Sequence, residues 1–352
     1  MVFLRYLLLC YCLLSISLAF AIESSGKTST LSHRDTIKVA LWGDQFYNDD
    51  PIIKHQEVND TIDSMNQHDI DFTLFIGDSK SGHSPCTDKA IGEDIKTIFN
   101  RLIVPTIYTP GDNEWTDCHR INNGEYDPLE RLTFLRHYFF TQAYSQGKTP
   151  IALKRQGSLG KAYSENGVFN IGNVSFVTVH IVGSNNNLAT TDADCFRFSH
   201  RRKADCAKAT TESKARSQKV IEWLNTTFAE ANKHQQVGIV IAMHANPYFP
   251  IELAGNRYHT DFLPSLDANN GFTDFFHALI QLTHTFKGEV LLVHGDSHYF
   301  RVDKPMLNED GSVTKNFSRV EVFGDKDNSW VELTIDKKAE TLFSIRPVIL
   351  PN

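Results

Sequence analysis

Six segments of the chain are short and almost continuously apolar, as buried β-strands are. They are rich in Val, Ile, Leu and Phe and cover residues 37–44, 71–78, 104–112, 174–183, 237–244 and 289–296. Helical candidates lie between them at residues 52–67, 88–101, 128–139, 206–232 and 272–286. Apolar strands that alternate with helices are typical of sheets covered by helices. The pattern therefore predicts an α/β fold.

The last forty residues have a different pattern. The segments RVEVFG, SWVELTID and LFSIRPVIL are separated by turn residues without helices between them, which predicts that the chain ends as antiparallel strands. No repeat and no Pro/Gly-rich linker divides the sequence. We expect one domain over residues 22–352, with a core at 37–300 and the antiparallel strands at 315–350.

The first residues have the features of a cleaved signal peptide. Arg5 precedes an apolar run at residues 6–18, and residues 19–21 read Ala-Phe-Ala, the form of a signal-peptidase site. The run is short for a bilayer span, which needs about 20 residues. We expect residues 1–21 to be removed and the mature chain to be secreted without a stable membrane span.

The cysteines predict two disulfides. Cys86, Cys118, Cys195 and Cys206 remain after removal of the signal peptide, and an even set is usual in exported proteins. Residues 186–208 are polar and aperiodic, so we expect a surface loop that a Cys195–Cys206 bond closes.

The charge of the chain excludes one broad class of function. A net charge of −7 argues against a nucleic-acid-binding protein, which normally carries a basic patch. Residues 200–203 (His-Arg-Arg-Lys) are locally basic, either as a solvated loop or as a contact for an anionic substrate. Sequons that would be glycosylated in a eukaryote lie at Asn59, Asn173, Asn225 and Asn316.

Acidic residues and histidines directly follow the predicted strands. They are Asp44, Asp78, the run Asp112-Asn113-Glu114, His244, and finally His294, Asp296 and His298. Ligands of open α/β sheets bind beyond the carboxyl ends of the strands. Carboxylate oxygens and imidazole nitrogens that converge there suit divalent transition metals. One Gly-Asp pair is weak evidence because both are turn residues, but five such strand ends predict a metal site.

The order of these motifs resembles that of the calcineurin-like metallophosphoesterase superfamily, which includes purple acid phosphatases and acid sphingomyelinases. The family pattern is D-x-H, G-D, G-N-H-[DE], H and G-H-x-H, and the resemblance covers about residues 38–300. It implies a four-layer α/β/β/α sandwich of two mixed sheets flanked by helices. It also implies two divalent metal ions (Mn, Fe or Zn) and hydrolysis of phosphate mono- or diesters by a metal-bound hydroxide. The substrate would be a phosphate-ester small molecule or a lipid headgroup.

Carried over residue by residue, the resemblance assigns the metal ligands Asp44, Asp78, Asp112, Asn113, His244, Asp296 and His298. Asp78 is the carboxylate shared by both metals. Asp112 aligns with the family's asparagine ligand, but a slipped register would make Asn113 the ligand. His294 could likewise replace Asp296. The additional carboxylates favour Mn or Fe over Zn.

Two positions depart from the family pattern. Phe46 replaces the histidine of D-x-H, which removes one expected ligand. Asn113 stands where the family carries the histidine that is usually assigned as the acid, and an amide cannot donate a proton in that role. His119 or His83 could supply this proton, or both could be bystanders. The predicted catalytic residues are Asp78, Asn113 and His119.

Several neighbouring residues have two interpretations. Lys80 could hold a phosphate oxygen or be an ordinary surface lysine. Asn185, Asn186 and Asn187 are interpreted most simply as turn residues, with phosphate contact as the alternative. The aromatic side chains nearest these motifs, Trp42, Trp115 and Phe249, are expected to pack around the site rather than to stack on a substrate.

The resemblance also predicts how the cysteines pair. If Asp78 and Asp112 face one metal pair, then Cys86 and Cys118 lie on adjacent loops and can reach each other. We therefore expect the bonds Cys86–Cys118 and Cys195–Cys206.

Two functions of different classes fit these residues. The first is a secreted metallophosphoesterase, which the retained acidic ligands favour. The second is a degenerate family member that binds a phosphorylated ligand without turnover, which Phe46 and Asn113 favour.

Overall fold

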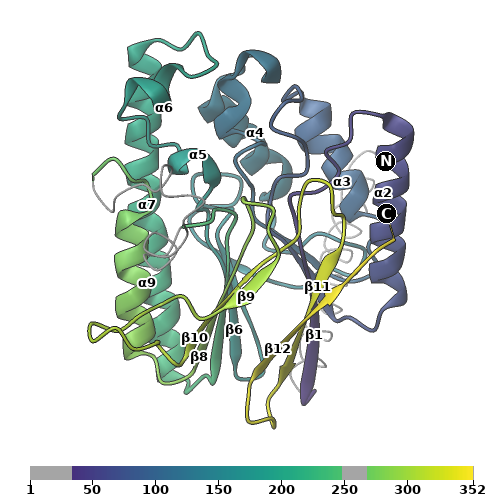
Figure 1. Cartoon of the computed structure of the whole chain (residues 1–352), viewed down its shortest axis with the longest axis vertical. Coiled ribbons are helices and arrows are strands. Elements are labelled where there is room, and N and C mark those ends of the chain that lie inside the picture. Colours follow the sequence, from purple (N-terminus) through teal and green to yellow (C-terminus); the bar gives the residue numbers. More distant parts are fainter. Residues whose placement is uncertain (1–33, 248–267, 352) are drawn as a thin grey trace, which may run out of the picture.

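The structure is a computed structural model that describes residues 34–247 and 268–351 (Figure 1). The expected signal peptide, residues 1–21, and Phe249 lie outside the described residues. Within the described ranges, no helix has both the length and the apolar character that a bilayer span requires.

The first sheet has five strands in the order β12-β11-β1-β2-β3. Their bounds are Thr36–Trp42 (β1), Phe72–Phe75 (β2), Thr106–Tyr108 (β3), Trp330–Asp336 (β11) and Phe343–Val348 (β12). β1, β2 and β3 are parallel, whereas β11 pairs antiparallel with β1 and β12 pairs antiparallel with β11. The last strands of the chain therefore complete the sheet that the first strand begins.

The second sheet has seven strands in the order β4-β5-β6-β7-β8-β10-β9. Their bounds are Lys154–Arg155 (β4), Gly167–Ile171 (β5), Val174–Thr178 (β6), Gly238–Ala242 (β7), Glu289–His294 (β8), Arg301–Asp303 (β9) and Phe317–Glu321 (β10). β6, β7, β8 and β10 are parallel neighbours, and the strands at both edges are antiparallel. Both sheets are therefore mixed.

The helices connect these strands. They are α2 (Pro51–Gln67), α3 (Asp94–Phe99), α4 (Pro128–Phe139), α5 (Gly183–Asn186), α6 (Asp192–Phe196), α7 (Lys203–Lys233) and α9 (Thr273–Thr285). Shorter helical turns are η1 (Lys89–Glu93), η2 (Thr116–His119) and η3 (Ile121–Asn123). Local sequence sets where two of the helices begin. Asp50 and Asp127 accept backbone N–H groups at the starts of α2 and α4, and proline occupies the first helical position of each.

The side chains of β1 alternate between two hydrophobic cores. Ile37, Val39 and Leu41 face the second sheet, in a core formed by the inner faces of both sheets. Ala40 and Trp42 belong to a separate core that also holds apolar residues of α2, α3 and α4. Because successive side chains of a strand point to opposite faces, one sheet is buried on both sides.

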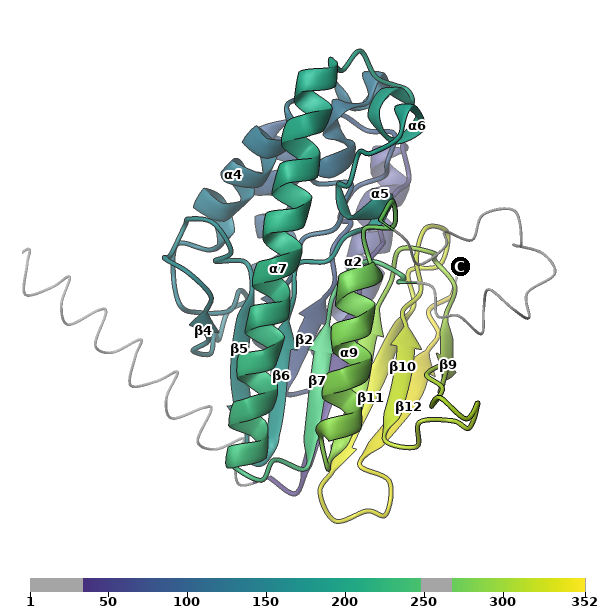
Figure 2. The same ribbon diagram turned by 90° about the vertical axis from the view of Figure 1, so that its left-hand side faces the viewer.

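The second sheet follows the same rule. Val240 and Ala242 of β7 belong to the core between the sheets, whereas Ile239 and Ile241 pack with α7 and α9. Figure 1 shows α7 and α9 along one side of the two sheets and α2 and α3 along the other, and Figure 2 shows α7 and α9 lying along the strands. The fold is thus the predicted α/β sandwich of two mixed sheets flanked by helices.

Two details of the sequence-based prediction were wrong. The segments SWVELTID and LFSIRPVIL form the antiparallel pair β11 and β12, as predicted, but the start of RVEVFG belongs to β10, which joins the second sheet and is antiparallel to β9 and parallel to β8. Residues 186–208 are not simply a loop, because they contain α6 and the start of α7. The two predicted disulfides are confirmed: Cys86 is bonded to Cys118, and Cys195 to Cys206.

Candidate metal centre

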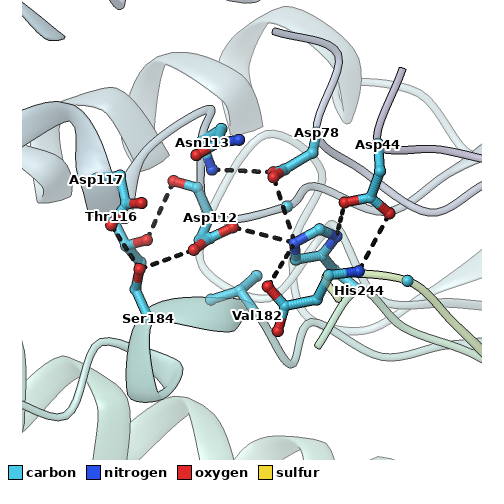
Figure 3. Close-up of polar contacts among 12 residues, drawn as sticks. Asp44, Asp78, Asp112, Asn113, Thr116, Asp117, Val182, Ser184 and His244 are labelled. Carbon is cyan, nitrogen blue, oxygen red and sulfur yellow. Dashed lines mark hydrogen bonds and ion pairs between the residues drawn. The ribbon is translucent and has the colours of Figure 1, made fainter. Parts of the chain in front are cut away.

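Acidic and histidine side chains meet where strands of both sheets end (Figure 3). The first sheet contributes Asp44, Asp78 and Asp112, and the second contributes His244, Asp296 and His298. Two sets, Asp44–Asp78–His244 and Asp112–His244–Asp296, each offer ligand atoms within 4.8 Å of one another. Each set could hold a metal ion.

His244 lies at the middle of the site and belongs to both sets. Its Nε2 atom is 3.0 Å from Asp112 Oδ1, 3.5 Å from Asp78 Oδ2 and 3.7 Å from Asp296 Oδ1. Its Nδ1 atom is 3.0 Å from the carbonyl oxygen of Ile76. Since a carbonyl oxygen only accepts, Nδ1 carries the hydrogen, and Nε2 is the atom that faces the carboxylates.

The protonation of His244 reflects its surroundings. Burial alone would lower the pKa of His244, but the carboxylates of Asp78 and Asp44 raise it well above the ordinary value. In the absence of a cation, a proton on Nε2 therefore neutralises part of the acidic cluster. A histidine whose Nδ1–H is held by a backbone carbonyl presents Nε2 in the way that metal-binding histidines do.

Three of the carboxylates, Asp78, Asp112 and Asp296, differ in how readily they ionise. Burial raises the pKa of Asp78 well above its ordinary value, and burial together with Asp112 raises the pKa of Asp296 to about 7. Burial also opposes ionisation of Asp112, but hydrogen bonds from His244 and Ser184 lower the pKa of Asp112 below its usual value. Full ionisation of this buried cluster is therefore unfavourable unless positive charge lies beside it.

Asp44 connects the two sheets. Its Oδ2 atom accepts the backbone N–H of Asp296 at 3.1 Å, and its Oδ1 atom is 3.4 Å from His298 Nε2. Burial opposes protonation of His298, but the interaction with the Asp44 carboxylate raises the pKa of His298. Asp44 Oδ1 is buried and lies at ion-pair distance from His298, but no hydrogen bond to it is formed among the described residues, so it is a candidate ligand atom.

Asp78 is held by hydrogen bonds to both of its carboxylate oxygens. Oδ1 accepts the backbone N–H of Asn113 at 2.9 Å, and Oδ2 accepts the hydroxyl of Tyr47 at 3.1 Å. The side-chain amide of Asn113 donates to the Lys80 carbonyl and lies 3.4 Å from the Tyr47 hydroxyl. Of the two possible registers, Asp112 is therefore the one whose side chain faces His244. The sequence analysis did not identify Tyr47.

Glu114 positions the loops rather than the reacting groups. Its side chain is buried, and it accepts backbone N–H groups of Asp78, Ser79 and Gly111 at 2.8–3.1 Å. Buried N–H groups need acceptors, so this carboxylate determines how closely the loops after β2 and β3 approach each other.

Glycines allow the carboxylates to lie against the backbone. A Cβ atom on Gly111 would lie 2.0 Å from Asp78 Oδ1, and one on Gly295 would lie 1.9 Å from Asp44 Oδ2. A Cβ on Gly183 would lie 2.4 Å from Asp296 Oδ1. No larger residue fits at these positions without moving the candidate ligands.

The backbone at the site is strained. Asp44, Asp78, Asp296 and His298 have φ angles of 54°, 55°, 75° and 57°. This left-handed conformation costs roughly 1–2 kcal/mol for an ordinary residue. Strain of this kind concentrates at functional sites, where the surrounding structure over-determines it.

A further strained segment brings Ser184 to the site. The four consecutive residues 184–187 all have φ between 49° and 62°, so α5 is in part a left-handed turn. Ser184 Oγ lies 2.7 Å from Asp112 Oδ2 and 2.6 Å from Asp117 Oδ1. Burial and the nearby Asp112 raise the pKa of Asp117 to about 7. Neither Ser184 nor Asp117 was predicted from the sequence.

Arg216 of α7 fixes this turn. Its guanidinium is fully buried, lies over the Trp115 ring and donates to both the backbone and side-chain oxygens of Asn186. The side-chain amide of Asn185 donates hydrogen bonds to the carbonyls of residues 188 and 269, and that of Asn187 donates to the carboxylate of residue 212. The prediction that the three asparagines form a turn is confirmed.

Other predicted residues lie around the centre. Lys80 is not a surface lysine, because it is only 2% exposed, and burial lowers its pKa. Trp42 and Trp115 are buried in the core beside the site, as expected, and so is Phe46. His294 is buried but belongs to neither of the two sets.

The two candidate proton donors lie farther from the carboxylates. His119 Nδ1 contacts the Thr116 carbonyl and is 2.6 Å from Arg201 Nη2. Burial and Arg201 lower the pKa of His119 to about 3, so this ring is neutral at pH 7. His83 is exposed and pairs with Asn122. A catalytic role for His119 stays a prediction.

The residues present fit a divalent cation. Four carboxylates and one oriented imidazole form an oxygen-rich donor set that suits a divalent metal ion. A cation could bind the buried Oδ1 atom of Asp44. It would also replace the proton that His244 otherwise holds on Nε2.

Comparison with known proteins identifies no family. No family model matches the sequence, and no curated protein matches it. Among solved structures, the chain is similar to GAP50, the anchor in the inner membrane complex of Plasmodium, with 11% identity, a TM-score of 0.43 and 90% of each chain covered. It is also similar to the sulfate thiohydrolase SoxB of Thermus thermophilus in complex with glycerol, with 13% identity and a TM-score of 0.38, over 85% of this chain and 41% of that one. Likenesses this remote carry no argument about function.

Proposed function

We propose that this chain is an extracytoplasmic, metal-dependent hydrolase of phosphate mono- or diesters. The orientation of His244 is the observation that carries the proposal, because its Nδ1–H is bound to Ile76 O and its Nε2 faces three carboxylates. Two disulfides support an oxidising, extracytoplasmic location.

The candidate ligands of such a centre are Asp44, Asp78, Asp112, His244, Asp296 and His298. A divalent cation supplies Lewis acidity: it lowers the pKa of water and stabilises the charge that develops on a phosphoryl group. The chain's own residues hold the ligands in place. Tyr47 and the backbone of Asn113 orient Asp78, and Ser184 orients Asp112. Lys80 adds a buried positive charge beside the carboxylates, which suits a phosphate.

The test is hydrolysis of an aryl phosphate by protein loaded with Mn, compared with protein from which metal has been removed and verified by elemental analysis. His244→Asn keeps a donor near the position of Nδ1 but lacks Nε2. We expect this variant to lose metal and to lower turnover at least a hundredfold. His137→Asn is the matched control, because His137 is an exposed histidine of α4 whose Nδ1 also bonds to a backbone carbonyl, that of Thr133. Full activity after complete metal removal would refute the proposal.

A second candidate function is binding of a phosphorylated ligand without turnover. Phe46 is buried against Trp42 and offers no ligand atom, and the side chain of Asn113 cannot act as an acid. The same experiment separates the two functions. A protein that retains metal and binds phosphate, but hydrolyses neither mono- nor diesters, is a binding protein.

A further inference from the structure

A small pocket lies directly beside the candidate metal centre, between the loop after β3 and the segment that contains α5 and α6. Its volume is about 240 Å³. Its lining includes three arginines (Arg120, Arg197 and Arg201), two aspartates (Asp117 and Asp194) and the hydroxyls of Thr116 and Ser184. The arginines of this pocket outnumber its aspartates, although the net charge of the chain is −7.

The pocket and the metal centre share a wall. The hydroxyl of Ser184 lies 2.7 Å from Asp112 Oδ2, and it accepts a hydrogen bond from Arg120 Nη2 at 3.2 Å. A single side chain thus separates a candidate metal ligand from a guanidinium. A group bound in this pocket would lie next to a phosphate at the metal centre.

The arginines of the pocket differ in how they are neutralised. Arg120 is paired with Asp117 at 2.6 Å. Neither Arg197 nor Arg201 has a carboxylate within ion-pair distance in the described part of the chain. Arg197 lies over the ring of Phe198, and Arg201 Nη2 contacts the neutral imidazole of His119. Burial lowers the pKa of Arg201 to about 10, which leaves it charged at neutral pH.

The unpaired arginines are held on a constrained loop. The Cys195–Cys206 disulfide closes the segment that carries Arg197 and Arg201. The backbone of Phe198 accepts the N–H of Ile121, which joins this segment to the loop after β3. The backbone that carries Arg197 and Arg201 is therefore constrained beside the centre, and such preorganisation reduces the entropy lost on binding.

We propose that this pocket binds a second phosphate group of the substrate, next to the ester that is hydrolysed. The planar guanidinium offers paired N–H donors that match phosphate oxygens, so two arginines without partners suit a phosphate better than a neutral group. The assignment of this phosphate to the substrate rests on the proposed function. The existence of an anion site in the pocket does not.

Calorimetry with inorganic pyrophosphate tests the pocket without any enzymatic activity. The protein is first depleted of metal, so that the probe cannot bind through a metal ion. We expect Arg201→Gln and Arg197→Gln each to weaken pyrophosphate binding at least tenfold. Arg202→Gln is the matched control on the same loop, because Arg202 is exposed and paired with Asp205, and it should bind pyrophosphate normally. No binding by the unmodified protein, or equal binding by all three variants, would overturn the inference.

A second measurement assigns the anion to the substrate. With the Mn-loaded protein, kcat/KM is compared for an aryl ring that bears one phosphate ester and for the same ring with two. Arg201→Gln should lower kcat/KM for the two-phosphate compound at least tenfold more than for the other, and Arg202→Gln should change neither.

The outcomes separate this inference from the proposed function. Arginine-dependent pyrophosphate binding without hydrolysis of any ester would refute the hydrolase and leave the anion site standing. If hydrolysis depends on metal, but Arg201→Gln leaves the ratio of kcat/KM between the two-phosphate and the one-phosphate compound unchanged, the hydrolase is supported and the second phosphate position is refuted.

Discussion

The charge of Asp78 provides a direct test of the metal centre. Asp78→Asn keeps the shape of the side chain and suits the left-handed backbone, since asparagine tolerates a positive φ. Oδ1 of the new side chain can still accept the N–H of Asn113. The substitution removes one negative charge from a buried cluster in which Asp44 and Asp78 offer oxygens within 4.8 Å.

The distances between these groups indicate how Asp78→Asn changes the free energy of unfolding of the metal-free protein. Two unit charges 4.8 Å apart repel by roughly 3–4 kcal/mol at an effective dielectric constant of 20. Attraction to protonated His244, 3.5 Å away, offsets a similar amount. Burial therefore decides whether the substitution stabilises or destabilises the metal-free protein. It raises the pKa of Asp78 well above its ordinary value, which means that the folded protein disfavours the ionised carboxylate. At pH 8 we therefore expect metal-free Asp78→Asn to be more stable than the unmodified protein.

Thermal unfolding with and without Mn measures both consequences. A cation that binds only the folded state stabilises it by about 2.7 kcal/mol at one hundred times its Kd. This corresponds to a rise in Tm of roughly 4 °C for a chain of this size. The unmodified protein should show this rise. Asp78→Asn should begin at a higher Tm and lose most of the rise, and its turnover should fall by orders of magnitude.

Two variants control for backbone and side-chain effects. Asp78→Ala also loses both hydrogen bonds and should be less stable than Asp78→Asn with or without metal. Asp325→Asn makes the same chemical change at another left-handed aspartate, one outside both ligand sets, and should keep the rise with Mn. If metal-free Asp78→Asn is destabilised and still responds fully to Mn, Asp78 is a turn residue and the reasoning is wrong.

Three further changes test other parts of the site. Gly183→Ala would place a methyl group 2.7 Å from Asp112 Oδ2, so calorimetry should show Mn affinity reduced at least tenfold, and unchanged affinity would contradict the close packing of this backbone. Arg216→Ala leaves the acceptors of a fully buried guanidinium unsatisfied, so urea unfolding should show that the free energy of unfolding falls by about 3–5 kcal/mol. A fall below about 1 kcal/mol would mean that the left-handed turn is stable without Arg216. Replacing Cys195 and Cys206 with serine opens a short loop and should lower the free energy of unfolding by about 3 kcal/mol. The same double variant should weaken pyrophosphate binding and leave Mn affinity intact, and equal pyrophosphate affinity would show that the disulfide does not organise the pocket.

The layers of the fold were predictable because buried strands need continuous apolar runs. Strands β2, β3, β6, β7 and β8 lie within predicted segments, and β1 begins one residue before its predicted segment. Three of the described strands were missed. β5 (GVFNI) contributes Phe169 and Ile171 to the core, but Gly167 and Asn170 interrupt its apolar run. β4 and β9 have two and three residues, and their side chains are largely exposed or half-buried. A strand that contributes little to the core leaves little hydrophobic pattern in the sequence.

The candidate site was only partly predictable for a related reason. Asp44, Asp78 and His244 stand at the ends of obvious strands, where any ligand of an α/β sheet must lie. Ser184 has no such signal. It reaches Asp112 because Asn186 holds a left-handed turn, and Asn186 is held in turn by Arg216 from a distant helix. Contacts between segments far apart in the chain leave no periodicity that a single sequence can reveal.

The pairing of β1 with β11 has a consequence for how this protein is made. Thr36 lies opposite Asp336, so one edge of the first strand finds its partner only after about 300 more residues have been synthesised. Until then that edge exposes unpaired N–H and C=O groups, which are a template for aggregation. Pairing across such a distance is slow, because much chain entropy is lost before any contact compensates for it. Newly made chains should therefore depend on a chaperone to cover β1, and truncation before Trp330 should yield aggregates rather than a smaller folded protein.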